Sequence, residues 1–236
     1  MEKETSIASA HIDYNLLARL SHDVRGPFNG LIGFSDLLST HFDELTDDKR
    51  REYADLIKQL SRKSFYQLQF FTIWLKLISN NLHLNQAVVE YREIIQQSIE
   101  FCSNDVESKS ITIVEPQNQA FRLHADALLL TTAVSSILSS AIRLMRTHGH
   151  LTLTTLSDNP LHLRISGEYT NTIHPQSDPF QLILLARNEY TESSAKLWIA
   201  KQIIEKHEGI LSFGPSVPSA AFEIDITLPE VSNTPG

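Results

Sequence analysis

The chain has 236 residues, of which 42% are hydrophobic and 20% charged, and its formal net charge at pH 7 is −8. These proportions are typical of a folded globular protein and exclude extensive disorder. The acidic balance argues against a broad surface for nucleic acid or anionic lipid. A single cysteine, Cys102, excludes an internal disulfide and a cysteine-rich zinc site, which fits a reducing cytoplasm. The sequence has neither a secretion signal nor a run of about 18 apolar residues, so we expect no membrane insertion.

Glycine and proline divide the chain into two parts of different character. Residues 34–148 contain no glycine, and most of this stretch is predicted to be helical. After Gly149 the pattern alternates between apolar and polar residues, which is typical of strands. The predicted strands cover residues 111–114, 151–156, 161–165, 210–213 and 222–228. The fold class is therefore α+β.

Two long amphipathic helices open the chain. In the first, apolar residues recur at heptad a and d positions, and the second, over residues 48–79, spaces them by three or four. The short connection between them predicts an antiparallel hairpin. Because two helices alone enclose no core, we expect two hairpins to form a homodimeric four-helix bundle; the alternative is that the stripe packs on the second part of the same chain. The predicted dimer core comprises Leu17, Leu20, Val24, Leu31, Phe34, Leu60, Leu68 and Phe71.

His22 falls at heptad position f, on the solvent side of the first helix. A neutral imidazole is a competent nucleophile near neutral pH. Arg25 and Gly26 lie three and four residues further on, on the same face, where Arg25 is able to hold a phosphoryl group or a carboxylate. Pro27 removes a helical hydrogen bond next to this face.

Residues 21–28, Ser-His-Asp-Val-Arg-Gly-Pro-Phe, resemble the H-box of two-component sensor histidine kinases. The resemblance implies that His22 accepts a phosphoryl group and exchanges it with an aspartate of a receiver domain, and that Asp23 orients or deprotonates it. Arg25 and Phe28 are the expected contacts for the docked receiver. The family usually has Thr, Ser or Asn at the position of Gly26, so the resemblance does not extend to dephosphorylation of the receiver.

The second part of the chain resembles the kinase ATPase domain, an α/β sandwich of the gyrase and histidine-kinase type. Residues 81–95, 109–113, 199–209 and 221–229 carry this likeness. The resemblance implies a lead over 1–12, a dimerisation and phosphoacceptor domain over 13–80, a linker over 81–92, a degenerate ATPase-like domain over 93–230 and a tail over 231–236.

The positions that bind nucleotide in the family are changed throughout. Its magnesium-binding helix carries two asparagines and a lysine, and this chain has serines and an arginine, which lack the amide oxygens that suit a hard cation. Its adenine-binding aspartate and two glycines correspond to Gly167, Tyr169 and Asn171, and strand alternation turns Glu168 the other way. The glycine-rich turn that cradles phosphate has no glycine here. The degenerate positions are Ser136, Ser140, Arg143, Gly167, Tyr169, Asn171, Ser194 and Lys196.

We therefore expect a degenerate, cytoplasmic, dimeric member of the family that relays phosphate through His22 to or from receiver aspartates. No cofactor and no metal are expected, and phosphotransfer is favoured over ATP-dependent autophosphorylation. One alternative is an active ATP-dependent sensor kinase with an atypical nucleotide site, which would bind Mg-ATP. The other is a non-catalytic dimeric adaptor for a kinase or response regulator.

Overall fold

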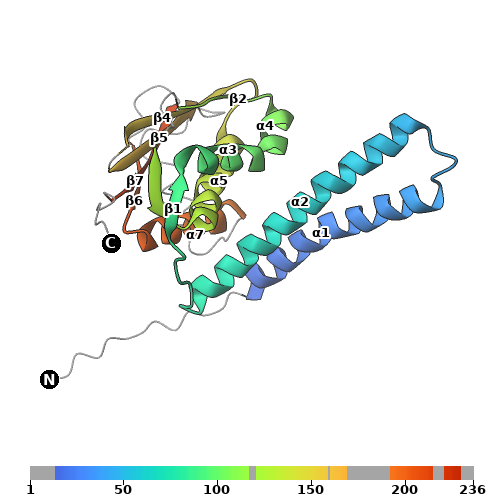
Figure 1. Ribbon diagram of the computed structural model, residues 1–236, viewed down its shortest axis with the longest axis horizontal. Helices are drawn as coiled ribbons and strands as arrows, with labels where there is room; N and C mark the ends of the chain where they lie inside the picture. Colours follow the sequence, from blue (N-terminus) through green and yellow to red (C-terminus); the bar gives the residue numbers. More distant parts are fainter. Residues whose placement is uncertain (1–13, 117–120, 159, 169–191, 215–220, 230–236) are drawn as a thin grey trace. The chain divides into compact units, whose positions relative to one another are not determined.

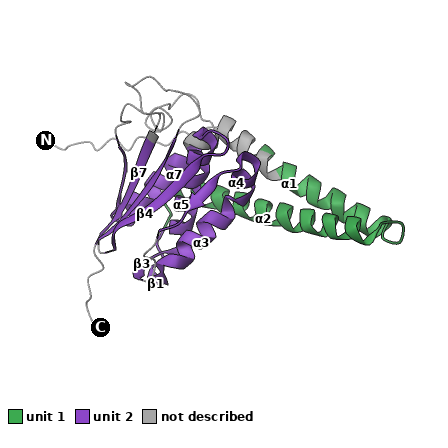
Figure 2. Cartoon of the chain, turned by 90° about the horizontal axis from the view of Figure 1, so that it is seen from above, with its two compact units in different colours: residues 1–82 green, residues 83–236 purple. Residues whose placement is uncertain are grey.

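The computed structural model describes residues 14–116, 121–158, 160–168, 192–214 and 221–229. The predicted lead and tail lie outside them. The chain divides into two compact units, residues 1–82 and 83–236 (Figure 2).

The first unit is an antiparallel hairpin of two long helices, α1 (Tyr14–Thr40) and α2 (Asp47–Ile78), as predicted (Figure 1). The hydroxyl of Thr46 caps α2 by accepting a hydrogen bond from the amide of Lys49, which satisfies one of the free donors of the first turn. At the turn, the guanidinium of Arg50 lies 4.4 Å from the centre of the Phe42 ring and donates to the Phe42 carbonyl at 2.8 Å. These contacts close the hairpin over a six-residue connection.

The facing sides of α1 and α2 set their register. An ideal Cβ on Gly30 would lie 3.0 Å from Cδ1 of Leu60, so the two helices approach closely at this level. Further toward the turn, the rings of Phe34 and Tyr53 are 5.5 Å apart. Of the predicted dimer core, Leu31, Phe34, Leu60 and Phe71 are half-buried and Leu68 is exposed. The side chains of Leu17, Leu20 and Val24 lie outside the described part of the structure.

The second unit is an α/β sandwich. Its five-stranded mixed sheet has the order β2-β4-β5-β7-β6, and β1 pairs separately with β3. Only the β2–β4 pair is parallel within the described sheet. The strands are β1 (Ala87–Glu90), β2 (Thr112–Val114), β3 (Arg122–Ala125), β4 (His150–Asp158), β5 (Leu161–Glu168), β6 (Ile210–Phe213) and β7 (Ala221–Leu228). The described helices are α3 (Tyr91–Phe101), α4 (Ser103–Lys109), α5 (Ala127–Leu144) and α7 (Glu192–Lys206). Strand β1 occupies the last part of the stretch assigned to the linker.

One face of the sheet carries the core and packs under helices (Figures 1 and 2). Leu163 and Ile165 on β5, and Ile224 and Ile226 on β7, are fully buried, while the residues between them are only partly covered. This is the alternation of a sheet with one solvated face. Helix α5 is long and apolar enough to span a membrane by composition, but 72% of it is buried, as in a core helix.

Candidate functional site

The H-box lies on α1. The side chains of His22 and Arg25 are exposed, as is Gly26, and Pro27 is buried. Since residues three and four apart share a helical face, His22 and Arg25 form one accessible surface. Phe28, 37% exposed, lies beside them. The side chain of Asp23 lies outside the described part. This arrangement leaves an imidazole, a guanidinium and an aromatic ring open to a protein partner.

The two serines that the resemblance aligns with magnesium-binding asparagines are buried residues of helix α5. Ser136 and Ser140 are 5% and 1% exposed, and the hydroxyl of Ser140 donates to the carbonyl of Ser136 at 2.8 Å. A hydroxyl that is buried and already bonded to its own helix is a poor cation ligand. Arg143 is exposed near the end of this helix.

Gly167, which the resemblance aligns with the adenine-binding aspartate of the family, has little room beside it for a side chain. An ideal Cβ on Gly167 would lie 2.8 Å from Cζ of Phe222 and 3.3 Å from Cε of Met145. Phe222 is directly opposite Gly167 in the β5–β7 pair, and both Phe222 and Met145 are buried. The neighbouring Glu168 is exposed and forms an ion pair with Arg146. The chain's own side chains therefore fill the space next to Gly167.

The remaining degenerate positions are less fully described. Tyr169, Asn171 and the segment 172–191, where a docked helix was predicted, lie outside the described residues. Ser194 lies in the first turn of α7, and its side chain is not described. Lys196 is half-buried in the same helix. Among the described residues, no group of three His, Cys, Asp or Glu side chains is placed to hold a metal ion.

The buried Cys102 and the half-buried Lys109 have shifted pKa values. Burial raises the pKa of the Cys102 thiol to about 12, and Asp105 adds to the shift. Burial lowers the pKa of Lys109, whose ammonium donates to the carbonyls of Arg143 and Met145 at 2.7 and 2.9 Å. Lys109 thereby satisfies carbonyls at the C-terminal end of α5, which have no partner within the helix.

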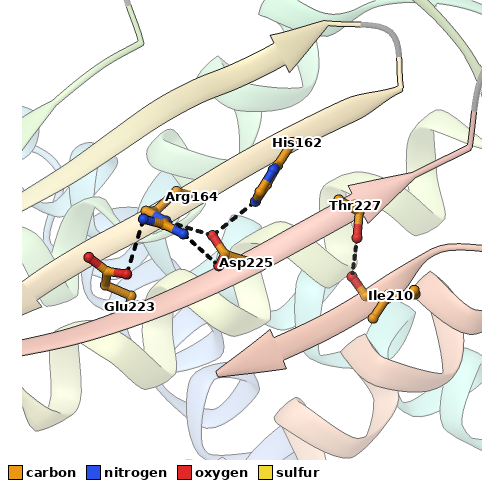
Figure 3. Close-up of polar contacts among 6 residues, drawn as sticks. All are labelled: His162, Arg164, Ile210, Glu223, Asp225 and Thr227. Carbon is orange, nitrogen blue, oxygen red and sulfur yellow. Dashed lines mark hydrogen bonds and ion pairs between the residues drawn. The ribbon is translucent and has the colours of Figure 1, made fainter. Parts of the chain in front are cut away.

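Sequence reasoning missed a polar cluster on the solvated face of the sheet (Figure 3). Arg164 on β5 donates to both carboxylate oxygens of Asp225 on β7, at 2.8 and 3.0 Å, and its other terminal nitrogen lies 3.1 Å from Glu223. His162 lies 3.2 Å from Asp225. The sequence signal was the charge at alternate positions of two strands, but the pairing of these strands was not predictable locally.

The cluster sets the charge state of Asp225. Partial burial by itself raises the pKa of this carboxyl, but the guanidinium of Arg164 and the imidazole of His162 outweigh burial and hold the pKa below its usual range. The negative charge of Asp225 is therefore favoured in the folded protein.

The sequence and the fold of this chain are similar to those of known proteins. A sensor-like histidine kinase of Rhizobium meliloti is 24% identical over 246 residues, an alignment that covers 97% of this chain and 46% of the relative. The histidine kinase AdeS of Acinetobacter baumannii has the same fold, with a TM-score of 0.55 at 12% identity over 90% of this chain and 98% of AdeS. The chain is therefore similar, over nearly its whole length, to two-component sensor histidine kinases. No family model matches it.

The predicted histidine-kinase fold, a helical hairpin followed by an ATPase-type sandwich, is thus confirmed. The chain spans less than half the length of its Rhizobium relative. The histidine kinase ThkA, solved in complex with the response regulator TrrA, has a TM-score of 0.51 at 17% identity, over 91% of this chain and 61% of that one.

Proposed function

We propose that this histidine kinase relative is a cytoplasmic phosphotransfer protein that has lost ATP binding. His22 would take a phosphoryl group from the phospho-aspartate of one receiver domain and give it to the aspartate of another. In the first transfer the bond between phosphorus and the carboxylate oxygen breaks, a bond to an imidazole nitrogen forms, and the imidazole N–H proton leaves. Arg25 balances phosphoryl charge on the same face.

The observation that carries the proposal is the filled space at Gly167. A purine-binding carboxylate cannot be accommodated where Phe222 and Met145 already contact the backbone position. The buried Ser136 and Ser140 of α5 support the same proposal, because the Ser140 hydroxyl is bonded within its own helix and neither serine has the amide oxygen that suits a magnesium ion. The phosphoacceptor surface on α1, by contrast, is exposed.

We also propose that the working form is a homodimer. The hairpin leaves apolar side chains of both helices exposed, namely Ile32 and Leu37 on α1 and Phe65, Leu68 and Leu75 on α2. A second hairpin covers such a surface in a four-helix bundle. The receiver would then dock on α1 around Arg25 and Phe28, as a protein partner of the kind found with ThkA.

The test has two arms that use wild type and His22→Gln. In the first, purified protein is incubated with Mg-ATP, and acid-labile phosphate is measured. We expect no labelling, and labelling that His22→Gln abolishes would overturn the loss of ATP binding and favour an active kinase. In the second arm, a receiver phosphorylated by acetyl phosphate is the donor. We expect transfer to wild type only, whereas no transfer from any receiver of the source organism would favour an adaptor.

A further inference from the structure

Two polar side chains of α2, the buried Ser64 and the half-buried Gln67, each have one buried atom without a hydrogen-bond partner. Ser64 is 2% exposed, and its hydroxyl has no hydrogen-bond partner in the structure. The amide oxygen of Gln67, one turn further along, is likewise buried and without a partner. A buried polar group without a partner destabilises a fold by about 1–3 kcal/mol. Ser64 also interrupts an otherwise apolar stripe, so packing alone does not explain a serine at this position.

The register of the hairpin places these two residues level with the H-box. Leu60 contacts the position of Gly30, and the helices are antiparallel. Because both helices rise by the same distance per residue, four residues further along α2 correspond to four residues earlier on α1. Ser64 therefore lies level with Gly26, next to Pro27, and Gln67 lies level with Asp23.

At this level α1 has a main-chain acceptor that its own helix leaves unsatisfied. Pro27 lies inside the helix and has no N–H, so the carbonyl of Asp23 lacks its usual donor four residues on. Residues four apart lie on the same face, and Pro27 is buried, so this carbonyl is on the inner side of the hairpin. The Ser64 hydroxyl, which lacks an acceptor, and the Asp23 carbonyl, which lacks its helical donor, therefore lie at the same level between α1 and α2.

We propose that Ser64, supported by Gln67, is a positioning residue for the phosphoacceptor helix. Its hydroxyl donates to the Asp23 carbonyl through one bridging water molecule. The bond replaces the one that Pro27 removes, and it fixes the bend of the helix turn that presents His22. This role rests on the proposed function of His22.

The test is a double-mutant cycle between Ser64 and Pro27. Pro27→Ala restores an N–H to the Asp23 carbonyl, so a partner on α2 becomes unnecessary. In the wild-type background, we expect Ser64→Ala to lower the maximal rate of transfer from a phosphorylated receiver about fivefold, the usual contribution of one hydrogen bond, with the half-saturating receiver concentration unchanged. Ser64→Thr keeps the hydroxyl and should keep the rate. In the Pro27→Ala background, Ser64→Ala should change the rate less than twofold.

The matched control is Ser61→Ala, which removes an exposed hydroxyl from the same helix and should change nothing. An equal effect of Ser64→Ala in both backgrounds, or none beside Pro27, would overturn the proposal.

A readout that needs no phosphate separates this proposal from the proposed function. Hydrogen–deuterium exchange of the α1 turn around Pro27 should speed up severalfold in Ser64→Ala, and not in Pro27→Ala/Ser64→Ala. If no receiver phosphorylates wild type, the proposed function fails while the exchange cycle still decides the role of Ser64. Unchanged exchange in Ser64→Ala would reject that role.

Discussion

Gly167 is the residue on which the proposed loss of nucleotide binding depends. It has no side chain, so the Phe222 ring on the neighbouring strand packs over its backbone, where Met145 joins it. Aromatic rings commonly cover glycines across paired strands in this way. The strand is intact, and these two side chains fill the space beside Gly167.

The first prediction is that an aspartate restored at this position does not restore a nucleotide site. Gly167→Asp forces the carboxylate against the buried Phe222 ring, and overpacking of this kind costs about 1–3 kcal/mol, with an unpaired charge adding to it. Thermal unfolding should therefore begin several degrees lower, and calorimetric titration with Mg-ATP should remain flat. Glu168→Gln, at the exposed neighbouring residue, should leave the melting temperature within about two degrees. A stable Gly167→Asp that binds Mg-ATP would contradict this account.

The second prediction concerns Cys102, which is 1% exposed and whose pKa burial raises to about 12. A thiol reacts as the thiolate, so it should be inert in the folded protein at pH 8. Titration with a chromogenic disulfide reagent should release one equivalent in denaturant and almost none in buffer over the same minutes. Rapid reaction of the native protein would show that the helices around Cys102 open readily.

For single residues, the sequence predicted exposure well where exposure depends on the position of the residue around a helix. The heptad pattern predicted that His22 faces solvent, and the structure has it exposed. It did not predict the contact over Gly167, since Phe222 lies 55 positions further along the chain and strand pairing brings the two together. Ser64 was visible only as a break in a stripe.

Among the elements, the long periodic ones were predicted closely. The helix expected over 48–79 runs from Asp47 to Ile78, because both its apolar period and its Thr46 cap are local signals. The pairing of β1 with β3 was not predicted. Ala87–Glu90 has only four residues and no strong alternation, and its partner lies more than 30 residues away.

The third prediction tests the hairpin as half of a bundle. Leu68 belongs to the predicted dimer core and is 42% exposed in the single chain. Leu68→Lys would bury an ammonium in the interface, which is strongly unfavourable without a partner. Sedimentation equilibrium should show a dimer for wild type and a dissociation constant at least tenfold weaker for the variant.

Lys63→Glu changes an exposed charge on the same helix and is the control. A monomeric wild type, or a variant that dimerises as tightly as wild type, would favour packing of the stripe within one chain.

At the scale of the whole molecule, the chain is two units that carry one tryptophan each. Trp74 is buried in α2 of the first unit, and Trp198 is in α7 of the second. Trp198→Phe leaves fluorescence from the first unit and Trp74→Phe leaves it from the second. Separate units need not unfold together, so the two reporters allow the stability of each to be followed.

The last prediction uses the second reporter to test the cluster around Asp225. The pKa of Asp225 is lowered in the folded protein, so its charge stabilises the second unit above the ordinary range of an aspartate, near pH 4. As the pH falls, the unfolded chain takes up this proton first, and the stabilisation is lost as the pH passes the lower folded pKa.

In the Trp74→Phe background at pH 7, Asp225→Asn should lower the free energy of unfolding by about 1 kcal/mol, as expected for a partly exposed, two-point ion pair. The difference should be smaller at pH 3, below the unfolded pKa of the aspartate, than at pH 7. In the Trp198→Phe background, Asp225→Asn should leave the urea midpoint reported by Trp74 unchanged. A difference that is the same at pH 3 and pH 7 would mean that Asp225 acts through its hydrogen-bond acceptors and not its charge, because Asn keeps the size but replaces one acceptor oxygen of the Arg164 pair with an NH2 donor.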